Sequence, residues 1–505
     1  MNDLLPFLPG QLNQVLDGIP YFMPEICLSV LFVLILVTDL FFGKNSTWLC
    51  KIVACAGLVV VIFKDLEQFR FLLSATHSLL FGEMLLIQHT SLIFKLIIDV
   101  LAIPLLLYFD WDDELRSHKK GLSDLYSIAI AAIFGLHLMV MASNLLSIYL
   151  SVEMVSLASY LMVAYRSEKG WSSEAGLKYV LFGAASSAIM LYGISLLYGF
   201  GGTLNLFTEN LLPGLMLVNP IAVSFALILV FVGIGFKLSF IPMHFWVPDI
   251  YQGAPTPVTA FLSTVSKIAA FGLLVNFLTP FVYFPKWAAF DFALFFSVIG
   301  IATMIAGNFA AVLQTNIKRM LAYSSIGHTG FALMAIVAFT NPGNTAGKLS
   351  ALIFYLFVYA LANTGALMLA SYFANTSKAE DLDAYKGLGL KYPVAGVSFV
   401  VVLISLAGLP VTAGFNGKLL VFSSVYSQYQ LSHNIWLLLL MITGAVTTVV
   451  SLFYYIKIPL NLFLRKPEKI ADYPPSSRYL VVAVAIISIL LVYLGLFPDI
   501  LTKYL

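Results

Sequence analysis

The sequence predicts an all-α membrane protein with about fourteen transmembrane helices. Of its 505 residues, 60% are hydrophobic and only 10% are charged, and the mean hydropathy is +0.95. A water-soluble protein of this length has no interior large enough to hide so much apolar surface. The apolar stretches recur as windows of roughly 18 to 25 residues, the length that an α-helix needs to cross about 30 Å of hydrocarbon.

Fourteen spans are expected, and two of them are interrupted. The seventh runs into Pro242 and Pro248, and the twelfth contains Gly408 and Pro410, so both are expected to be discontinuous helices. The first span lacks a small-residue cleavage site, so we expect it to be retained rather than removed as a signal peptide. The expected spans are 19–42, 48–66, 90–109, 122–141, 143–165, 174–200, 218–241, 255–280, 288–311, 320–340, 347–374, 393–427, 432–460 and 478–500.

Composition also excludes several kinds of site. The three cysteines, Cys27, Cys50 and Cys55, lie in or beside the first two spans, and no Cys/His cluster has the spacing of metal ligands. No metal or iron–sulfur centre is therefore expected in this chain. A net charge of +2 is too small to indicate a nucleic-acid partner, and no glycine-rich phosphate loop follows a plausible strand.

Basic residues are distributed unequally between the two sides of the expected membrane domain. Loops that follow odd-numbered spans hold 16 of them, and the opposite loops hold four. Because basic loops stay on the cytoplasmic side, both termini are expected on the periplasmic side, or on the equivalent side of an organelle membrane. The sixteen are Lys44, Lys51, Arg116, Lys119, Lys120, Arg166, Lys169, Lys318, Arg319, Lys378, Lys386, Lys391, Arg465, Lys466, Lys469 and Arg478; the four are Lys64, Arg70, Lys286 and Lys348.

Five lysines and one glutamate lie inside the spans, and all of them except Lys95 are candidate functional residues. A charged side chain at bilayer depth costs about 2.5 to 3.5 kcal/mol on insertion scales, and such residues are normally kept only where a polar interior pathway uses them. Ionisable groups in such a pathway point to proton transport. The six residues are Lys95, Glu153, Lys178, Lys237, Lys267 and Lys418.

Glu153 lies near the middle of the fifth span, with no loop within reach, so it needs a buried partner. Lys178, near the cytoplasmic end of the sixth span, is the expected partner. The pair is either a static ion pair or a gate for protons. A static role is the weaker interpretation, because hydrophobic residues can replace a buried ion pair at little or no loss of stability.

Three lysines are expected to form the central relay. Lys237 precedes the Pro242 break, Lys267 follows in the middle of the eighth span, and Lys418 follows the Gly408 break. Burial favours the neutral amine, so these groups are suited to taking up and releasing protons near neutral pH. Discontinuous helices at matching positions of two halves mark the binding region of transporters built from inverted repeats.

The spans are expected to form two sets of five. Each set has an odd number of helices, so the second enters the membrane upside down relative to the first, although we find no convincing residue-level identity between them. Residues 1–121 hold the N-terminal spans, 122–280 the first repeat (spans four to eight), 281–460 the inverted second repeat (spans nine to thirteen), and 461–505 a loop and the last span.

One histidine is a further candidate, and four other titratable residues in or beside the spans carry weaker signals. His328 lies mid-span among hydroxyls and glycines, where a neutral imidazole relays protons, although a lone helical histidine is more often a packing residue. His244 beside the Pro242 break and His137 in the fourth span carry weaker signals. Lys95 and Asp99 are four residues apart on one helix and are expected to form a structural pair.

Two long motifs resemble those of a known family. Residues 244–260 (HFWVPDIYQGAPTPVTA) and 316–328 (NIKRMLAYSSIGH) are similar to signatures of the antiporter-like subunits of respiratory complex I and of multisubunit cation/proton antiporters. The resemblance covers essentially the whole chain. Residues 174–187 and 405–418 look most like the N-type subunits of bacterial complex I, because M-type subunits usually carry glutamate in place of Lys418. The L-type subunits carry a long C-terminal lateral helix, whereas this chain stops at Leu505.

The resemblance implies a role for each candidate residue. Glu153 and Lys178 would form the gate, Lys237 and Lys267 the central relay, His328 a link and Lys418 the terminal site. It also implies that this chain is a translocase subunit of an NADH:quinone oxidoreductase in the bacterial inner membrane, surrounded by lipid and by other membrane subunits. Flavin mononucleotide, iron–sulfur clusters and quinone would be bound by those partner subunits, with no redox centre here. One departure is Asn316, where relatives often have aspartate.

Other functions are compatible with parts of this pattern. A subunit of a multisubunit Na⁺/H⁺ antiporter or of a membrane-bound hydrogenase would share the same motifs. A monomeric transporter of a small solute would require a substrate cavity and activity of the isolated chain. A non-conducting scaffold would keep its buried lysines locked in ion pairs, so their substitution would affect assembly alone.

Overall fold

The computed structural model describes residues 8–43, 46–72, 77–119, 121–208, 210–284, 287–340, 345–466 and 476–505. Within these ranges, 13 helices are long and apolar enough to cross a membrane. A shorter apolar helix, Pro393–Ala407, forms the interrupted twelfth crossing together with the helix after it. The prediction of an all-α membrane protein with about fourteen crossings is therefore confirmed.

Helices dominate because a lipid-exposed backbone must satisfy its hydrogen bonds within the segment. In the first half they are α1 (Leu8–Gly18), the 3₁₀-helix η1 (Ile19–Phe22), α2 (Met23–Phe42), α3 (Ser46–Leu72), α4 (His89–Trp111), α5 (Asp113–Arg116), α6 (Ser123–Met141), α7 (Leu145–Val163), α8 (Gly170–Gly201), α9 (Leu211–Met216), α10 (Pro220–Leu238), α11 (Trp246–Gly253), α12 (Thr256–Ser263) and α13 (Val265–Tyr283). In the second half they are α14 (Phe292–Val312), α15 (Ile317–Thr340), α16 (Thr345–Ser377), the 3₁₀-helix η3 (Leu382–Tyr385), α17 (Leu388–Lys391), α18 (Pro393–Ala407), α19 (Ala413–Ser432), α20 (Ile435–Tyr455), α21 (Lys457–Pro459), the π-helix η4 (Leu460–Leu464), α22 (Arg478–Leu496) and α23 (Asp499–Thr502).

One small sheet lies between α3 and α4, and the sequence did not predict it. Strands β1 (His77–Leu80) and β2 (Leu85–Gln88) pair antiparallel, with His77 opposite Gln88 and Leu80 opposite Leu85. The turn between them holds Phe81, Gly82 and Glu83, all with positive φ. Four residues are too few for the alternation of polar and apolar side chains that identifies a strand in a sequence.

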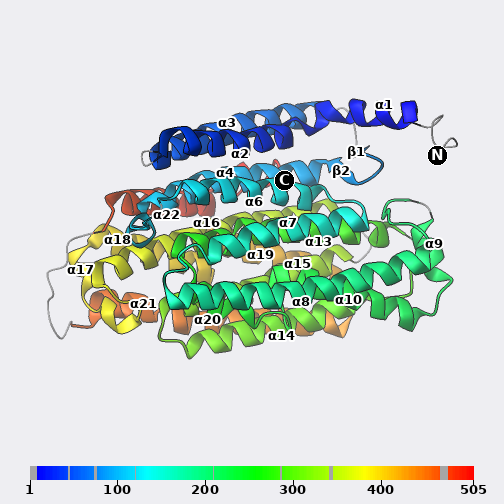
Figure 1. Cartoon of the computed structure of the whole chain (residues 1–505). Coiled ribbons are helices and arrows are strands. Elements are labelled where there is room, and N and C mark those ends of the chain that lie inside the picture. The colour runs from blue at the N-terminus through cyan, green and yellow to red at the C-terminus, as the bar shows by residue number, and fades with distance from the viewer. Residues whose placement is uncertain are drawn as a thin grey trace.

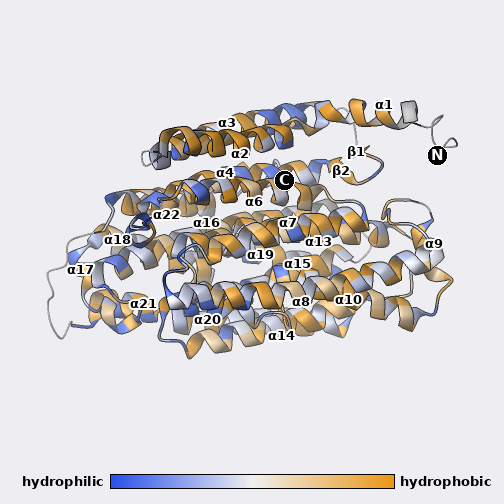
Figure 2. Ribbon diagram, viewed as in Figure 1, coloured by the Kyte–Doolittle hydropathy of each residue, from blue (hydrophilic) through white to orange (hydrophobic). Residues whose placement is uncertain are grey.

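The long helices run roughly alongside one another, and α2 and α3 lie together at one edge of the bundle (Figure 1). These two helices pack on each other and on α4 and α6. Hydrophobic residues cover most of the helix lengths, and hydrophilic ones are frequent near the helix ends (Figure 2). Apolar side chains on the outer faces of α2, α3 and α22 are exposed, as expected for helices that face lipid.

The centre of the bundle is formed by α12, α13, α15 and α16. Almost every residue in the apolar stretches of these helices is buried inside the protein, in contrast to α2, α3 and α22. Polar groups on the central helices are therefore shielded from lipid by the surrounding ones.

Both predicted helix interruptions are present. Helix α10 ends at Leu238, where Ser239 is left-handed at φ +58°, and the indole of Trp246 donates to the carbonyl of Phe236 at 3.1 Å. Helix α18 ends at Ala407, the following Gly408 is left-handed at φ +80°, and α19 begins only at Ala413. The carbonyl of Phe236 also accepts from the backbone N–H of Ser239 at 3.3 Å, so polar groups satisfy the backbone at the break after Leu238.

A third interruption, at Thr264 between α12 and α13, was not predicted. Thr264 adopts φ −118° and ψ −87° in the middle of the expected eighth span. Its hydroxyl donates to Ala260 O at 2.6 Å, and the Tyr359 hydroxyl donates to Ser263 O at 3.2 Å. No glycine or proline marks this break, because hydroxyl groups from the same helix and from α16 stabilise it.

Candidate functional site

The three relay lysines each lie beside one of these interruptions. Lys237 is in the last turn of α10, Lys267 follows the Thr264 break, and Lys418 lies in the second turn of α19. All three are buried, with no side chain more than 5% exposed. The sequence predicted helix interruptions beside Lys237 and Lys418. The structure has a further interruption beside Lys267.

Lys237 has no hydrogen-bond partner among the described residues. The acidic group within electrostatic range of its amine is Glu153, on α7. One oxygen of that carboxylate, Oε1, likewise lacks a hydrogen-bond partner in the described part of the chain. Glu153 on α7 therefore acts on Lys237 on α10 electrostatically, without a direct hydrogen bond.

The expected pair between Glu153 and Lys178 is not formed in the structure. The Lys178 amine instead lies 2.8 Å from Glu174 on the same helix and 3.0 Å from Asp249 on α11. Its side chain is 39% exposed and lies eight residues from the start of α8, while Glu153 lies ten residues from the end of α7, so the two positions differ little in depth. Asp249 is the partner of Lys178 because α11 packs against α8, a contact that spacing along the sequence does not reveal.

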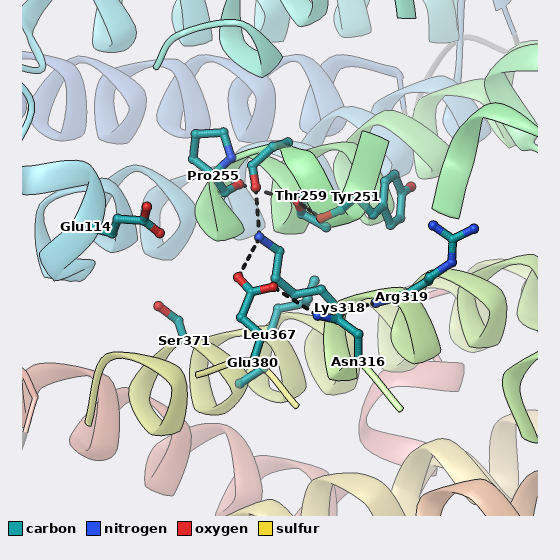
Figure 3. A network of polar contacts seen from close by, with 12 residues as sticks. Glu114, Tyr251, Pro255, Thr259, Asn316, Lys318, Arg319, Leu367, Ser371 and Glu380 are labelled. Atoms are coloured by element: carbon teal, nitrogen blue, oxygen red, sulfur yellow. Dashed lines mark hydrogen bonds and ion pairs between the residues drawn. The ribbon is translucent and has the colours of Figure 1, made fainter. Parts of the chain in front are cut away.

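A wide cavity of about 980 Å³, here called the vestibule, opens at this end of the bundle. Its wall includes Lys178, Asp249, Lys318, Arg319 and Glu380. The Lys318 amine donates to Ala254 O at 3.0 Å and to Glu380 at 3.2 Å, as Figure 3 shows. Asn316, the departure from the family pattern, donates to Glu380 at 3.1 Å and accepts from the backbone N–H of Arg319.

Asp249 joins three helices at the vestibule. Its two carboxylate oxygens accept from Lys178 on α8 and, at 2.7 Å, from Arg319 on α15. Partial burial alone would raise the pKa of Asp249, but the bonds to Lys178 and Arg319 outweigh burial and lower it. The carboxylate is therefore ionised at neutral pH.

Lys267 is held by hydroxyl groups rather than by an acid. Its amine donates to Ser325 Oγ at 2.7 Å, to Ser325 O at 3.0 Å and to Thr329 Oγ1 at 3.0 Å. The Ser325 hydroxyl is also 2.7 Å from the hydroxyl of Tyr359. Neutral partners of this kind leave the charge of Lys267 uncompensated, in contrast to a salt bridge.

His328 lies between Lys267 and Lys418. We call Lys237, Lys267, His328 and Lys418 the row. Both Lys267 and Lys418 are within electrostatic range of its ring. Its Nδ1 is 2.8 Å from the Tyr355 hydroxyl and its Nε2 is 3.1 Å from the Tyr455 hydroxyl. The imidazole is thus hydrogen-bonded at both nitrogens to groups that can donate or accept.

Lys418 donates to the carbonyl of Ala407 at 2.8 Å, which the end of α18 leaves free. Its amine also lies over the ring of Phe331, 4.8 Å from the centroid. A cavity of about 10 Å³ borders Lys418, His328 and Tyr355. That volume is roughly what the centre of one water molecule needs, so a water-mediated contact fits between these groups.

The weaker candidates occupy other places. His244 lies in the connection between α10 and α11, half-buried, and burial lowers the pKa of its imidazole. The expected pair between Lys95 and Asp99 is wrong. Lys95 binds two carboxylates from α2 and α3, and Asp99 binds His137 of α6. Contacts between helices therefore replace the contact along one helix.

Sequence reasoning missed most of the hydroxyl partners. Tyrosines in apolar helices are usually packing residues, so nothing along the chain distinguished those that contact the row. Ser325 and Thr329 were visible only as polar neighbours of His328. The missed partners of Lys267 and His328 are Ser325, Thr329, Tyr355, Tyr359 and Tyr455.

Chemically, the row is a series of amines and an imidazole with hydroxyl groups between them. Hydroxyls both donate and accept hydrogen bonds, so they can pass a proton between nitrogen groups. The lysines and the histidine of the row are buried inside the bundle. Such an arrangement is suited to moving protons rather than to binding an organic substrate.

Comparison with known proteins gives one family. Residues 142–451 match the model of the family described as "NADH:quinone oxidoreductase/Mrp antiporter, TM". The chain is 37% identical to NADH-quinone oxidoreductase subunit N 2 of Chloroherpeton thalassium, over 91% of this chain and 89% of that protein. It is 35% identical to NADH-quinone oxidoreductase subunit N of Chlorobium chlorochromatii, over 95% and 92%.

A solved structure agrees with these relatives. The chain superposes on one from respiratory complex I of Thermus thermophilus, a structure with bound aureothin, with a TM-score of 0.77. The two are 30% identical in sequence, and the match covers 95% of this chain and 98% of the other.

Proposed function

Since this chain belongs to the NADH:quinone oxidoreductase/Mrp antiporter membrane family, we propose that it moves protons across the bacterial plasma membrane as a subunit of an NADH:quinone oxidoreductase. The observation that carries this proposal is the buried row of Lys237, Lys267, His328 and Lys418. These groups have neutral hydrogen-bond partners or none, so their charge can change during a cycle.

Electron transfer belongs to other subunits in this proposal. The curated relatives are subunits of NADH-quinone oxidoreductases, and they match nearly the full length of this chain. Flavin mononucleotide, iron–sulfur clusters and quinone are bound by the partner subunits. This chain contributes the membrane part, contacts neighbouring membrane subunits and lipid, and carries no redox centre.

Glu153 and Lys178 form the gate. In the structure Lys178 is bound by Asp249 and Glu174, which leaves Glu153 free to act on Lys237. When Lys178 leaves Asp249 for Glu153, the negative charge near Lys237 is neutralised and its amine releases a proton. Quinone reduction in the partner subunits supplies the signal that shifts Lys178.

Protons then pass along the row. Lys237 exchanges with Lys267, the Ser325 and Tyr359 hydroxyls lead from Lys267 toward His328, and His328 exchanges with Lys418. Unit charges about 7 Å apart interact by roughly 2 kcal/mol at an effective dielectric near 20. Moving one charge through 100 mV takes about 2.3 kcal/mol, so electrostatic coupling between neighbours is of the right size.

The two interrupted helices support an inverted-repeat organisation. Helices α10 and α18 each occupy the fourth place in a set of five crossings, and each break has a buried lysine beside it. We assign residues 122–280 to the first repeat and 281–460 to the second. The first three crossings, within residues 1–121, and the last, within 461–505, flank the repeats.

The vestibule is the cytoplasmic entrance. It is lined by Lys318 and Arg319, which lie at the start of α15 and count among the basic residues of the predicted cytoplasmic side. Lys51 at the start of α3 pairs with Asp110 at the end of α4, so basic residues gather at that same end. Both termini then face the periplasm.

The test is proton pumping by the assembled complex in sealed vesicles that contain no Na⁺. Lys418→Ala is expected to reduce proton pumping several-fold while the complex stays assembled on a native gel. Full pumping by this variant would contradict the proposal.

A second candidate is a subunit of a Na⁺/H⁺ antiporter, which the family description includes, or of a membrane-bound hydrogenase. The same measurement separates the antiporter from the first candidate, because an antiporter requires Na⁺ for proton movement. Loss of all pumping in Na⁺-free medium by the unaltered complex would favour it.

A further inference from the structure

Five titratable side chains that the proton row does not use gather between the first four crossings. They come from α2, α3, α4 and α6, and every one is fully buried. We call these residues the N-terminal charge cluster: Glu25, Asp65, Lys95, Asp99 and His137.

The five groups form one connected set. The Lys95 amine lies 2.7 Å from Glu25 Oε1 and 2.7 Å from Asp65 Oδ1. The His137 ring lies 3.0 Å from Glu25 Oε1 through Nδ1 and 3.0 Å from Asp99 Oδ1 through Nε2. Glu25 is therefore shared between Lys95 and His137. A change of charge on one of the five groups alters the electrostatic potential at the other four.

The charges in this set do not balance. When Lys95 and His137 are both positive and all three acids are ionised, one negative charge is left over. Moving the proton that His137 and Asp99 share from one to the other does not change the net charge of the cluster. A net charge buried at this depth is expensive, so one additional proton on a carboxyl group makes the cluster neutral.

Open acceptor atoms are present for that proton. Glu25 Oε2, Asp99 Oδ2 and Asp65 Oδ2 have no hydrogen-bond partner among the described residues, whereas Asp65 Oδ1 faces the Lys95 amine. Asp65 is the best candidate, because its only contact in the cluster is the ion pair with Lys95. The other two acids each share a hydrogen bond with a ring nitrogen of His137.

A metal ion fits this site less well than a proton does. Ligand atoms of Glu25, Asp65 and His137 come within 4.8 Å of one another. However, the Lys95 amine already occupies the space between the two carboxylates. Both ring nitrogens of His137 also face carboxylates, so neither offers a free lone pair.

The cluster is close to one end of the bundle. Asp65 is seven residues before the end of α3 at Leu72, which corresponds to about 10 Å along a helix. Gln68 extends the hydrogen bonds of the cluster toward that end. Its side chain accepts from the Lys95 amine at 3.1 Å and donates to the carbonyl of Tyr21. By the distribution of basic residues, this end faces the periplasm.

We propose that the N-terminal charge cluster is a second proton-binding site, which holds one proton exchangeable with the periplasmic side. It is separate from the row of Lys237, Lys267 and Lys418. Binding of this proton does not depend on whether that row conducts, so the two proposals stand or fail separately.

The test is infrared spectroscopy of the complex in membranes, in the carbonyl region of protonated carboxylic acids. The unaltered complex is expected to show a band that disappears in Asp65→Asn, shifts in D₂O and declines as the pH of the medium is raised. The matched control is Glu67→Gln, because Glu67 is an exposed acid two residues away on α3. The control is expected to keep the band.

Identical spectra for Asp65→Asn, Glu67→Gln and the unaltered complex would overturn the proposal. If Asp65→Asn fails to assemble, Asp65→Glu decides the question, because it keeps a carboxyl group in the cluster. A changed band frequency in that variant supports proton binding, and an unchanged spectrum contradicts it.

Discussion

The three lysines of the row differ in how their amines are held. Lys237 has no hydrogen-bond partner among the described residues, Lys418 has one carbonyl, and Lys267 has three oxygens. Hydrogen bonds to a charged amine stabilise the charged form. Lys267 is therefore held by hydrogen bonds, whereas Lys237 depends on the charge of Glu153.

Removal of the Lys267 partners tests this difference. The double variant Ser325→Ala, Thr329→Val takes away two of the three oxygens and keeps the side-chain volumes similar. We expect proton pumping to fall several-fold, because Lys267 no longer holds its proton, while electron transfer and assembly persist. Pumping by proteoliposomes that contain the complex measures this.

A matched control for that variant is Ser297→Ala. Ser297 is buried in α14, and its hydroxyl has no hydrogen-bond partner in the described ranges. Pumping is expected to stay unchanged in the control. An equal loss in both variants would mean that the row is sensitive to packing rather than to its hydrogen bonds.

For single residues, the sequence predicted correctly that the lysines of the row are buried, but it did not predict which residues the charged side chains bind. Lys237, Lys267 and Lys418 are buried as expected, because a charged side chain in the middle of a long apolar helix can avoid lipid only inside the protein. Lys178 binds Asp249, 71 residues away, rather than Glu153. Lys95 likewise binds residues of two other helices. Such partners depend on how helices pack, which the pattern along a single helix does not contain.

Among the elements, the interrupted helices set the positions of the amines. Gly408 closes α18 with φ +80°, a conformation that costs other residues about 1 to 2 kcal/mol. A Cβ at this position would lie 2.6 Å from Cδ and 3.2 Å from Nζ of Lys418. The glycine therefore provides the space that the Lys418 side chain occupies.

Gly408→Ala is expected to reduce proton pumping strongly, because the new methyl group displaces the Lys418 amine from Ala407 O. The control is Gly202→Ala, since Gly202 ends α8 with a similar φ of +68° and has no atom within 4 Å of its missing Cβ. The control carries the same backbone strain without the clash. Equal pumping by the two variants would contradict the explanation.

The ion pairs of Asp249 fix α11 between α8 and α15. The pKa of Asp249 is lower in the folded protein than the value of about 3.9 in an unfolded chain. Its contribution to stability is therefore complete above about pH 4 and is lost as the pH falls through the lower, folded pKa. For partly exposed pairs this amounts to about 0.2 to 1 kcal/mol each.

Asp249→Asn is expected to be less stable than the unaltered protein at neutral pH, and the difference is expected to shrink below about pH 4. Thermal unfolding of the complex at a series of pH values measures this. A stability difference that does not vary with pH would show that the ion pairs add nothing.

The helix breaks also show what the sequence could predict about elements. Glycine and proline marked the interruptions after Leu238 and at Gly408, and both are present. The break at Thr264 has neither residue. It is stabilised by hydroxyl groups, including one from α16, and only the packed structure shows them.

For the whole molecule, the proposal requires one orientation in the membrane. Ser117 and Leu217 are exposed in loops that are predicted to lie on opposite sides. With the three native cysteines replaced, Ser117→Cys is expected to react with an impermeant maleimide only in inside-out vesicles, and Leu217→Cys only in right-side-out ones. The reverse pattern would place the vestibule at the periplasm.

The central claim is that buried amines of this chain carry protons, and Lys237→Ala tests it most directly. The measurement is the number of protons pumped per electron transferred by the purified complex in proteoliposomes, with Lys64→Ala, a surface lysine of α3, as the control. We predict that Lys237→Ala lowers this ratio several-fold while assembly is retained and the control is unaffected. An unchanged ratio in Lys237→Ala would contradict the account.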